Sequence, residues 1–281
     1  MRRLFRGLAV LVFFLAAAAY ARVPAFIWAR PSVASAPAGP EGDLIRRGED
    51  VFARTYAYFG PFADGSGAGY AGNNLACANC HLDAGRAKYA FLLVGATNTY
   101  PKALKAGGPV VSLDERINQC MTRSMAGRPV PGGEPAFQAL RAYLVFLSAG
   151  IPPGVFMDGA GRVAIDDPPL APDAARGARV FAEHCAKCHR PDGLGARRGG
   201  AGTAYGYAFP PLWGGDSFAA DAGLADLKTI AGFVHANMPA GVDRWNPRLS
   251  VQQAYDVGRF VLSHDRPRGI STPQEHLNAA P

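Results

Sequence analysis

The sequence predicts an all-α fold, arranged as two similar small domains in tandem. Two observations support this prediction: a short pattern occurs twice along the 281 residues, and helix-capping signals are present without convincing period-2 strands. The composition agrees, because 49% hydrophobic and 18% charged residues are typical of a globular chain, and 34 glycines and 23 prolines indicate long ordered loops. A chain of this length can hold two domains of about 120 residues each.

The repeat combines a helical segment, a cysteine pair and a closing amphipathic segment. Its members are RRGEDVF (46–52) and ARGARVF (175–181), the Cys-x-x-Cys-His motifs at 77–81 and 185–189, and the closing segments at 139–150 and 254–264. The spacing from glycine to the first cysteine is 29 residues in the first half and 8 in the second, so the first half carries 21 extra residues, which we place within 53–74. The repeat therefore predicts two related domains.

Capping residues predict where several helices begin. Asp173 can cap the helix that runs through Phe181. Ser112 with Glu115, and Ser250 with Gln253, have the spacing of capping boxes. All the regular segments that the sequence supports are therefore expected to be helices.

The first 30 residues have the character of an export signal. A basic start, MRRLFR, precedes an uncharged run that ends in Ala-Tyr-Ala at 19–21, and RVPAFIWA continues the apolar character beyond it. A cleaved signal peptide and an uncleaved membrane anchor through residues 7–29 both remain open, and either places the body of the protein in the periplasm. The expected division is a signal peptide or anchor (1–28), a linker (29–42), domain 1 (43–150), a linker (151–172), domain 2 (173–268) and a C-terminal tail (269–281).

The charge of the exported part is mildly positive. The formal charge of +7 includes three arginines within residues 1–21, so the remainder carries +4. This surplus suits a small anionic substrate or an acidic protein partner. It does not suggest nucleic-acid binding, which would require a basic patch on a recognisable fold.

The two Cys-x-x-Cys-His motifs point to covalent haem. Two intervening residues let both sulfurs reach the two vinyl groups of a haem, and the histidine that follows is an axial ligand of the iron. A structural zinc site or a redox dithiol would be the alternatives. Two motifs with the same flanking helices favour two covalently bound haem c groups, and hence two class I cytochrome c-type domains. The attachment and proximal residues are Cys77, Cys80 and His81 for haem 1, and Cys185, Cys188 and His189 for haem 2.

Met238 is the expected second ligand of the haem 2 iron. It lies in FVHANMPAG (233–241), after an amphipathic segment and before a proline. His/Met coordination favours ferrous iron and raises the potential. A bis-His site through His235, and Met238 as a core residue, remain alternatives. His184, His264 and His276 are expected to be solvated.

Cys120 is the expected second ligand of the haem 1 iron, and it is the one cysteine outside the two motifs. If the Ser112 capping box begins a helix, Arg116, Cys120 and Ser124 lie on one face, with Arg123 beside them. Cations and a metal would both lower the pKa of a thiol there. Rival ligands are Met121 and Met125, and a surface helix with one buried cysteine is a further alternative.

The sequence resembles the dihaem thiosulfate dehydrogenases. The resemblance covers about residues 43–268 and depends on NLACANCHLDAG, ERINQCMTRSMAGRPVP, LRAYLVFLSAGIPPG, FPPLWGGDSF and ANMPAG, in that order. It implies two cytochrome c domains that couple two thiosulfates to tetrathionate, or catalyse the reverse reduction, with electrons passing from haem 1 to haem 2. It also implies His/Cys coordination by His81 and Cys120, His/Met coordination by His189 and Met238, and roles at the active site for Arg116 and Ser124.

This chain departs from the family pattern at several positions. Gln119 and Ala126 replace a usual glycine and a frequent asparagine, and Asn237 stands where some relatives have a lysine beside the methionine. Asn237 argues against a redox-linked exchange of lysine and methionine ligands here. Lys102 and Lys105 are the upstream basic residues, and Arg123 or Lys105 could add charge to the anion site.

The expected partners are thiosulfate, tetrathionate and a soluble electron acceptor, such as a small cytochrome c or an iron–sulfur protein. Two other functions remain open. One is a dihaem electron carrier without substrate chemistry. The other is a related sulfur-oxidising dihaem subunit that acts on a cysteine of a carrier protein.

Overall fold

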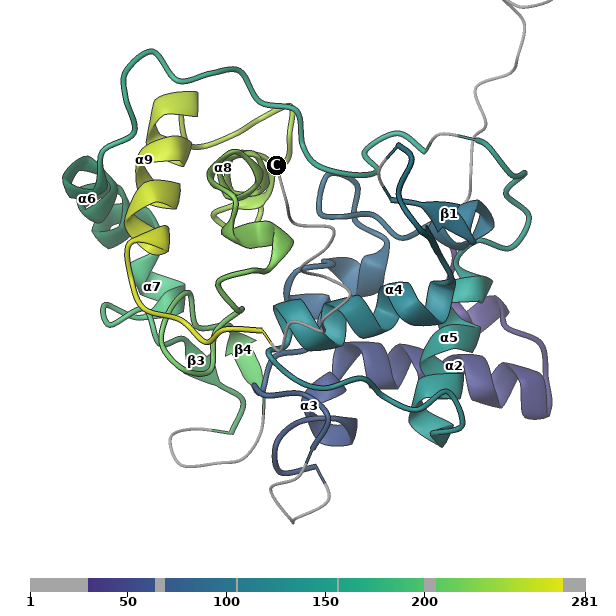
Figure 1. The fold of residues 1–281 in the computed structure, drawn as a ribbon. Coiled ribbons are helices and arrows are strands. Elements are labelled where there is room, and N and C mark those ends of the chain that lie inside the picture. Colours follow the sequence, from purple (N-terminus) through teal and green to yellow (C-terminus); the bar gives the residue numbers. More distant parts are fainter. Residues whose placement is uncertain (1–29, 64–68, 105, 156, 200–205, 270–281) are drawn as a thin grey trace, which may run out of the picture. The chain divides into compact units, whose positions relative to one another are not determined.

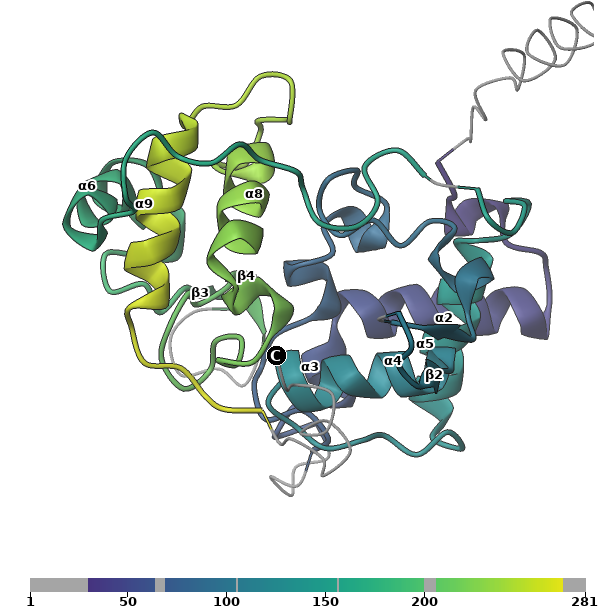
Figure 2. The same cartoon turned by 45° about the horizontal axis from the view of Figure 1, so that its top comes forward.

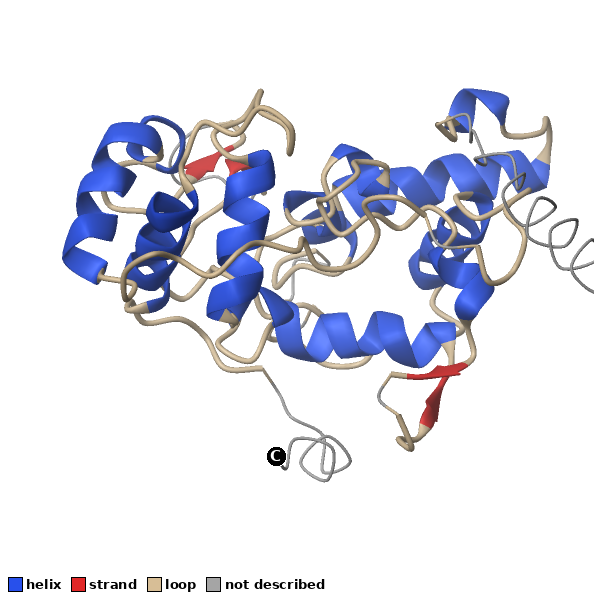
Figure 3. Cartoon of the chain, turned by 90° about the horizontal axis from the view of Figure 1, so that it is seen from above, coloured by secondary structure: helices blue, strands red, loops and turns tan. Residues whose placement is uncertain are grey.

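The computed structural model describes residues 30–63, 69–104, 106–155, 157–199 and 206–269. Helices predominate among these residues (Figure 3). The α-helices are α2 (Pro40–Ala53), α3 (Thr55–Tyr58), α4 (Leu113–Gln119), α5 (Pro135–Phe146), α6 (Ala174–His184), α7 (Ala186–His189), α8 (Leu227–Asn237) and α9 (Val251–Leu262). A π-helical turn, η5 (Cys120–Ser124), continues α4, and short 3-10 turns are η1 (Val33–Ser35), η2 (Cys77–Asn79), η3 (Asp83–Gly85), η4 (Ala96–Thr99) and η6 (Gly223–Ala225).

Two short antiparallel pairs of strands correct the expectation that every regular segment is a helix. β1 (Lys102–Ala103) pairs with β2 (Val110–Val111), and β3 (Ala196–Arg197) pairs with β4 (Tyr207–Phe209). Each strand has only two or three residues, which is too short to show a period of two in the sequence.

The predicted export segment and most of the predicted tail lie outside the described residues. Within the described ranges, no helix is both long and apolar enough to cross a membrane. The expected linker at 29–42 is partly helical, because α2 begins at Pro40 after Gly39. Proline is favoured at the first position of a helix, where its missing N–H would have no partner.

The sequence repeat corresponds to one helix crossing that occurs in both halves. α2 packs against α5 in the first half, and α6 packs against α9 in the second (Figures 1 and 2). The repeated glycine lies at each crossing. A Cβ on Gly48 would be 2.0 Å from the carbonyl oxygen of Ala139, and one on Gly177 would be 2.0 Å from that of Asp256. Only glycine allows the two helices to approach this closely.

The core of the first half lies along the α2–α5 crossing. Phe52 and Tyr143 are 2% and 0% exposed, and their ring centroids are 5.7 Å apart. The Tyr143 hydroxyl donates a hydrogen bond of 2.6 Å to the carbonyl of Ala84, beside the first Cys-x-x-Cys-His motif. The helix crossing therefore supports the loop that follows the motif.

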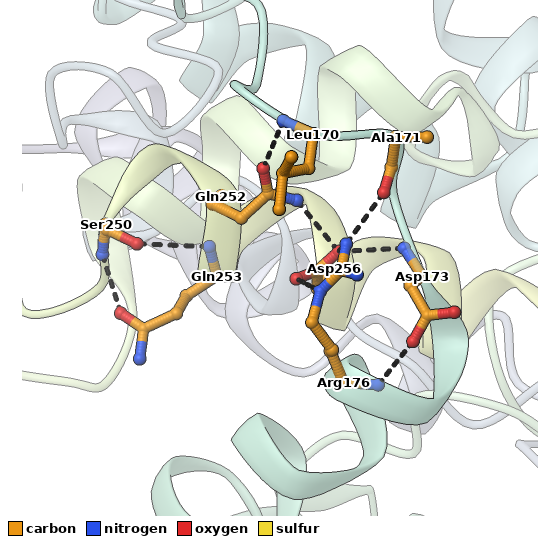
Figure 4. Close-up of polar contacts among 8 residues, drawn as sticks. All are labelled: Leu170, Ala171, Asp173, Arg176, Ser250, Gln252, Gln253 and Asp256. Carbon is orange, nitrogen blue, oxygen red and sulfur yellow. Dashed lines mark hydrogen bonds and ion pairs between the residues drawn. The ribbon is translucent and has the colours of Figure 1, made fainter.

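An ion pair between a partly exposed arginine and a buried carboxylate joins α6 to α9 in the second half (Figure 4). The Asp256 side chain is 3% exposed and accepts a hydrogen bond of 2.7 Å from Nε of Arg176. The carboxylate also accepts from the backbone N–H of Asp173 (2.8 Å) and from Nε2 of Gln252 (3.0 Å). These contacts fix the start of α6 against the middle of α9.

All three capping predictions are confirmed. The Asp173 carboxylate accepts a hydrogen bond of 2.7 Å from the N–H of Arg176, and α6 begins at Ala174, directly after this cap. Ser112 with Glu115 forms a reciprocal capping box at α4. Ser250 with Gln253 forms another at α9, visible in Figure 4.

Polar contacts link the two halves directly. The Asp216 carboxylate accepts from the backbone N–H of Asn74 (2.7 Å) and from the hydroxyl of Tyr207 (2.6 Å). Asn73, which is 0% exposed, donates to the carbonyl of Ser217 (3.1 Å). Asn73 and Asn74 lie just before Cys77, so these contacts attach the approach to the first motif to the second half.

Candidate functional site

The two Cys-x-x-Cys-His motifs adopt the same backbone turn. The N–H of His81 donates to the carbonyl of Cys77 at 2.9 Å, and the N–H of His189 donates to that of Cys185 at 2.9 Å. The Thr55 hydroxyl accepts from the N–H of Cys77 at 3.0 Å and lies 3.2 Å from its Sγ. In each turn the histidine follows the cysteine pair directly, as covalent haem attachment requires.

Each motif histidine has one ring nitrogen bound to a backbone carbonyl. Nδ1 of His81 lies 2.7 Å from the carbonyl oxygen of Phe91, and Nδ1 of His189 lies 2.7 Å from that of Pro210. This contact fixes the ring orientation and leaves Nε2 available to bind a metal. Burial lowers the pKa of both imidazoles, against the effect of these hydrogen bonds, and favours the neutral form that binds iron. The donor set therefore fits haem c.

The motif thiols do not have the properties of a redox dithiol. Burial raises the pKa of Cys77 to about 11 and that of Cys80 to about 12, and burial raises the pKa of Cys185 to about 11. None of the five cysteines forms a disulfide. A catalytic dithiol usually has a lowered pKa, whereas thiols in apolar surroundings suit thioether bonds to an apolar macrocycle.

Cys120 lies beside the first motif, at the point where α4 ends. A negative charge on Cys120 adds to burial in raising the pKa of Cys77 and Cys80. The fold therefore brings Cys120 close to two cysteines about 40 residues earlier in the chain. Nη1 of Arg116 donates a hydrogen bond of 3.2 Å to Sγ of Cys120. The structure therefore brings together the two residues that the four-residue spacing placed on one face.

The positive charge of Arg116 has no carboxylate partner among the described residues. The pKa of Arg116 is raised, first by the charge of Cys120 and then by Tyr100, while burial opposes the change. A partly buried cation that faces a sulfur and a phenol, without a neutralising acid, is a preorganised position for an anion.

Tyr100 is a residue that the sequence did not single out. Its side chain hydrogen-bonds to Arg116, and Nζ of Lys102 lies 4.7 Å from the centre of its ring. The β1–β2 pairing places Lys102 opposite Val111, so Tyr100 and the start of α4 emerge at the same end of the hairpin. The contact between Tyr100 and Arg116 depends on this hairpin, so it could not be inferred from local spacing. Lys105 lies outside the described residues.

Ser124 and Arg123 lie toward the second half of the chain. The carbonyl of Ser124 accepts from the N–H of Ala219 (3.3 Å). The Arg123 guanidinium donates from Nε and Nη2 to the carbonyl of Asp221, at 3.2 and 2.9 Å. This geometry does not support a place for Arg123 beside Cys120. The π-helical turn explains the difference, because the N–H of Met125 bonds five residues back to Cys120 and shifts the residues between them from the α-helical face.

The rival ligands of haem 1 are core residues in this structure. Met121 is 2% exposed and Met125 is 6% exposed, and both belong to the hydrophobic cluster that contains Phe52 and Tyr143. Neither is paired with a cation, whereas Cys120 accepts a hydrogen bond from Arg116. The contacts therefore favour Cys120 as the chemically distinct side chain of this segment.

Met238 directly follows α8 in the second half. Its N–H donates to the carbonyl of Val234 at 2.9 Å, and its side chain is half-buried. Nδ1 of His235 lies 2.9 Å from the carbonyl oxygen of Leu249. Asn237 donates from Nδ2 to the carbonyl of Tyr89 in the first half, at 3.0 Å. Asn237, which lies between the candidate ligands His235 and Met238, thus joins the two halves.

The expectation that His184 and His264 are solvated is wrong. The side chain of His184 is only 12% exposed. The ring of His264 stacks on Trp213, with a centroid distance of 4.0 Å and an interplanar angle of 12°. This stacking covers one face of the ring, and His264 is half-buried. His276 lies outside the described residues.

Comparisons with known proteins agree with this arrangement. The family model described as SoxA/TsdA, cytochrome c domain, matches residues 69–152, and the model described as cytochrome c matches residues 174–265. Thiosulfate dehydrogenase of Stutzerimonas stutzeri (strain A1501) is 37% identical over 85% of this chain and 72% of its own length. That of Allochromatium vinosum is 35% identical over 84% of this chain and 83% of its own length.

A solved structure shows the same fold. The as-isolated thiosulfate dehydrogenase (TsdBA) from Marichromatium purpuratum superposes with a TM-score of 0.75 at 32% identity, over 90% of this chain. The match covers 54% of that protein, so the present chain spans about half its length.

The fold and the two motifs define a dihaem cytochrome c, with two tandem cytochrome c domains that each bind one haem covalently. The extent of the similarity goes further than this class. The chain belongs to the thiosulfate dehydrogenase family, and it is an oxidoreductase of that type.

Proposed function

We propose that the protein oxidises thiosulfate at a site formed by Cys120 and Arg116, and that it joins two thiosulfates into tetrathionate. The observation that carries this proposal is the charge of Arg116, which lies 3.2 Å from the Cys120 sulfur and has no carboxylate partner among the described residues. An electron carrier has no need of a cation beside a free thiol. The family relationship supports the same substrate.

Arg116 offsets the repulsion between the reactants. Thiosulfate is a dianion, and two unit charges 4 Å apart repel by about 4 kcal/mol at an effective dielectric constant near 20. Two dianions involve four such pairs of charges. A fixed guanidinium with two parallel N–H donors stabilises the oxyanion without having to reorganise during the reaction.

Cys120 can divide the reaction into two steps. Its thiolate and the terminal sulfur of a first thiosulfate form an S–S bond and release two electrons. A second thiosulfate then attacks that sulfur, breaks its bond to Cys120 and leaves as tetrathionate, which restores the thiolate. The balance is two thiosulfates converted to one tetrathionate and two electrons. Every step is reversible in principle, so the same residues serve tetrathionate reduction.

The haem c groups supply one-electron acceptance, with transfer from haem 1 to haem 2 and on to an external acceptor. We assign His81 and Cys120 as the iron ligands of haem 1, and His189 and Met238 as those of haem 2. Two observations support this assignment: the carbonyl contacts of the two histidines and the half-buried position of Met238 at the end of α8. A thiolate ligand favours ferric iron and a thioether favours ferrous iron, so this set drives electrons outward.

We further propose that the reaction takes place in the periplasm. The apolar N-terminal segment with its basic start supports export, either as a cleaved signal or as an anchor through residues 7–29. The exported part carries +4, because three of the seven surplus positive charges are arginines within residues 1–21. An acidic soluble electron carrier would be attracted to such a surface.

Substitution of the two central residues tests the proposal. We expect Cys120→Met to give a folded dihaem protein with a higher haem 1 potential and tetrathionate formation reduced by about 10³-fold or more. Arg116→Ala should keep the haem spectrum and lower kcat/KM for thiosulfate by about 10²-fold, with partial recovery in Arg116→Lys. Steady-state kinetics and low-temperature electron paramagnetic resonance (EPR) measure both effects.

Arg46→Ala is a matched control, because Arg46 pairs with Asp43 on the exposed face of α2. It should leave kcat/KM within about twofold of the wild type. Near-normal turnover in Cys120→Met would exclude the sulfur-handling role, and an unchanged EPR spectrum in that variant would exclude the ligand role.

A further inference from the structure

Two aromatic residues after the first motif have left-handed backbone conformations. The φ angles are +62° at Tyr89 and +55° at Phe91. For bulky residues this region is rare and costs about 1–3 kcal/mol, so it persists only where neighbouring contacts maintain it. The segment Tyr89–Phe91 is therefore held in place by its surroundings.

Contacts from α8 of the second domain maintain this conformation. Nδ2 of Asn237 donates to the carbonyl of Tyr89 at 3.0 Å and to the carbonyl of Phe233 at 2.9 Å. The ring of Phe233 stacks on that of Phe91, with centroids 5.4 Å apart and an interplanar angle of 9°. From the segment between the two domains, the carbonyl of Gly159 accepts a hydrogen bond of 2.9 Å from the N–H of Tyr89.

The same segment provides the hydrogen-bond partner of the proximal histidine of haem 1. The carbonyl of Phe91 lies 2.7 Å from Nδ1 of His81, and the Phe91 ring contacts the imidazole edge at a centroid distance of 5.9 Å. Ala90, between the two strained residues, is 0% exposed. A small change in the Tyr89–Phe91 segment would thus alter the length or direction of this hydrogen bond.

We propose that Asn237 and Phe233 are positioning residues for haem 1, although they belong to the second domain. They hold the Phe91 carbonyl against His81, and they also lie on the helix that ends at Met238. This inference rests on the ligand set proposed above, since it connects the proximal side of one haem to the segment that supplies the second ligand of the other.

The physical consequence concerns the potential of haem 1. A carbonyl that accepts the Nδ1 proton increases the basicity of the ligating nitrogen, which stabilises ferric iron and lowers the potential. If reduction of haem 2 shifts Met238 and the end of α8, the shift reaches the Phe91 carbonyl through Asn237 and Phe233. By thermodynamic linkage, the redox state of haem 1 would then change the potential of haem 2 by the same amount.

Two substitutions test this positioning role in the intact dihaem protein. Asn237→Leu keeps the branched shape of the side chain and removes both hydrogen bonds, whereas Phe233→Leu removes the stacking and keeps an apolar residue. Tyr89→Phe is the matched control, because it removes only the hydroxyl that bonds to Asp158 and leaves the carbonyl in place. The reduction potential of each haem is measured by a spectroscopic redox titration with a chemical reductant, and ferric haem 1 is examined by EPR.

We expect both leucine variants to raise the haem 1 potential and to shift its EPR signal beyond the change seen in Tyr89→Phe. Haem 1 properties equal to those of the control in both variants would overturn the inference, whatever happens to haem 2. The test does not depend on thiosulfate. If the wild-type protein fails to oxidise thiosulfate but the haem 1 shifts occur, the proposed function fails and the positioning role stands.

Discussion

Arg116 and Cys120 are the residues whose relation could be predicted from spacing alone. A step of four residues on a capped helix places two side chains together, and the guanidinium does donate to the sulfur. Tyr100 could not be found in this way, because its contact with Arg116 depends on a hairpin with two-residue strands. The charge of Arg123 did not predict a place in the anion site either, since its guanidinium donates to the carbonyl of Asp221 in the other domain.

Tyr100→Phe should weaken the anion site by removing the hydroxyl that contacts Arg116. The loss of one hydrogen bond to a charged group is worth about 1.5–3 kcal/mol, so we expect kcat/KM for thiosulfate to fall by about 10- to 100-fold. The haem spectrum should stay unchanged, because Tyr100 contacts the cation and not the sulfur. Steady-state kinetics measure the change.

A double-mutant cycle shows whether Tyr100 acts through Arg116. In an Arg116→Ala background, Tyr100→Phe should change kcat/KM by less than about twofold, because the partner is already absent. Full additivity of the two substitutions would show that Tyr100 acts independently of Arg116.

At the scale of elements, helix starts were predictable and helix irregularities were not. Asp173, Ser112 and Ser250 each cap the expected helix, because capping depends on neighbours within three residues. The π-helical turn after Gln119 has no comparable local signal, and the proline that begins α2 at Pro40 lies in a stretch whose composition is typical of a linker. The π-helical turn matters most for the site, since it separates Ser124 from the face that carries Cys120.

The Arg176–Asp256 pair should make the stability of the second domain depend on pH. Burial alone would raise the pKa of Asp256, but hydrogen bonds from Arg176, the Asp173 backbone and Gln252 outweigh it and the pKa is lowered. A carboxylate with a lowered folded-state pKa contributes stability above its unfolded pKa of about 4, and this contribution is lost as the pH falls through the folded value.

Asp256→Asn should therefore destabilise the holoprotein by about 2–4 kcal/mol at neutral pH, with a smaller difference from the wild type below about pH 4. Denaturant unfolding at several pH values measures the difference. The control is Asp167→Asn, whose fully exposed pair with Lys228 should add little to the free energy of unfolding. A difference for Asp256→Asn that grows as the pH falls would contradict the sign of the pKa change.

For the whole molecule, the repeat was sufficient to predict two domains, because each copy carries its own helix crossing at Gly48 or Gly177. The contacts between the domains were not predictable. Asn74 with Asp216 and Asn237 with Tyr89 join residues far apart in the chain, and no periodicity or capping rule relates them. These contacts join the residues on either side of the first Cys-x-x-Cys-His motif to the second half of the chain.

The most direct test of the account is anaerobic mixing of the oxidised dihaem protein with thiosulfate, in which haem reduction and sulfur products are counted together. We expect both haems to be reduced, with one tetrathionate formed for every two haems reduced. Cys120→Met should lose this reaction. Haems that stay oxidised, or haems reduced while sulfite or sulfate is the product, would contradict it.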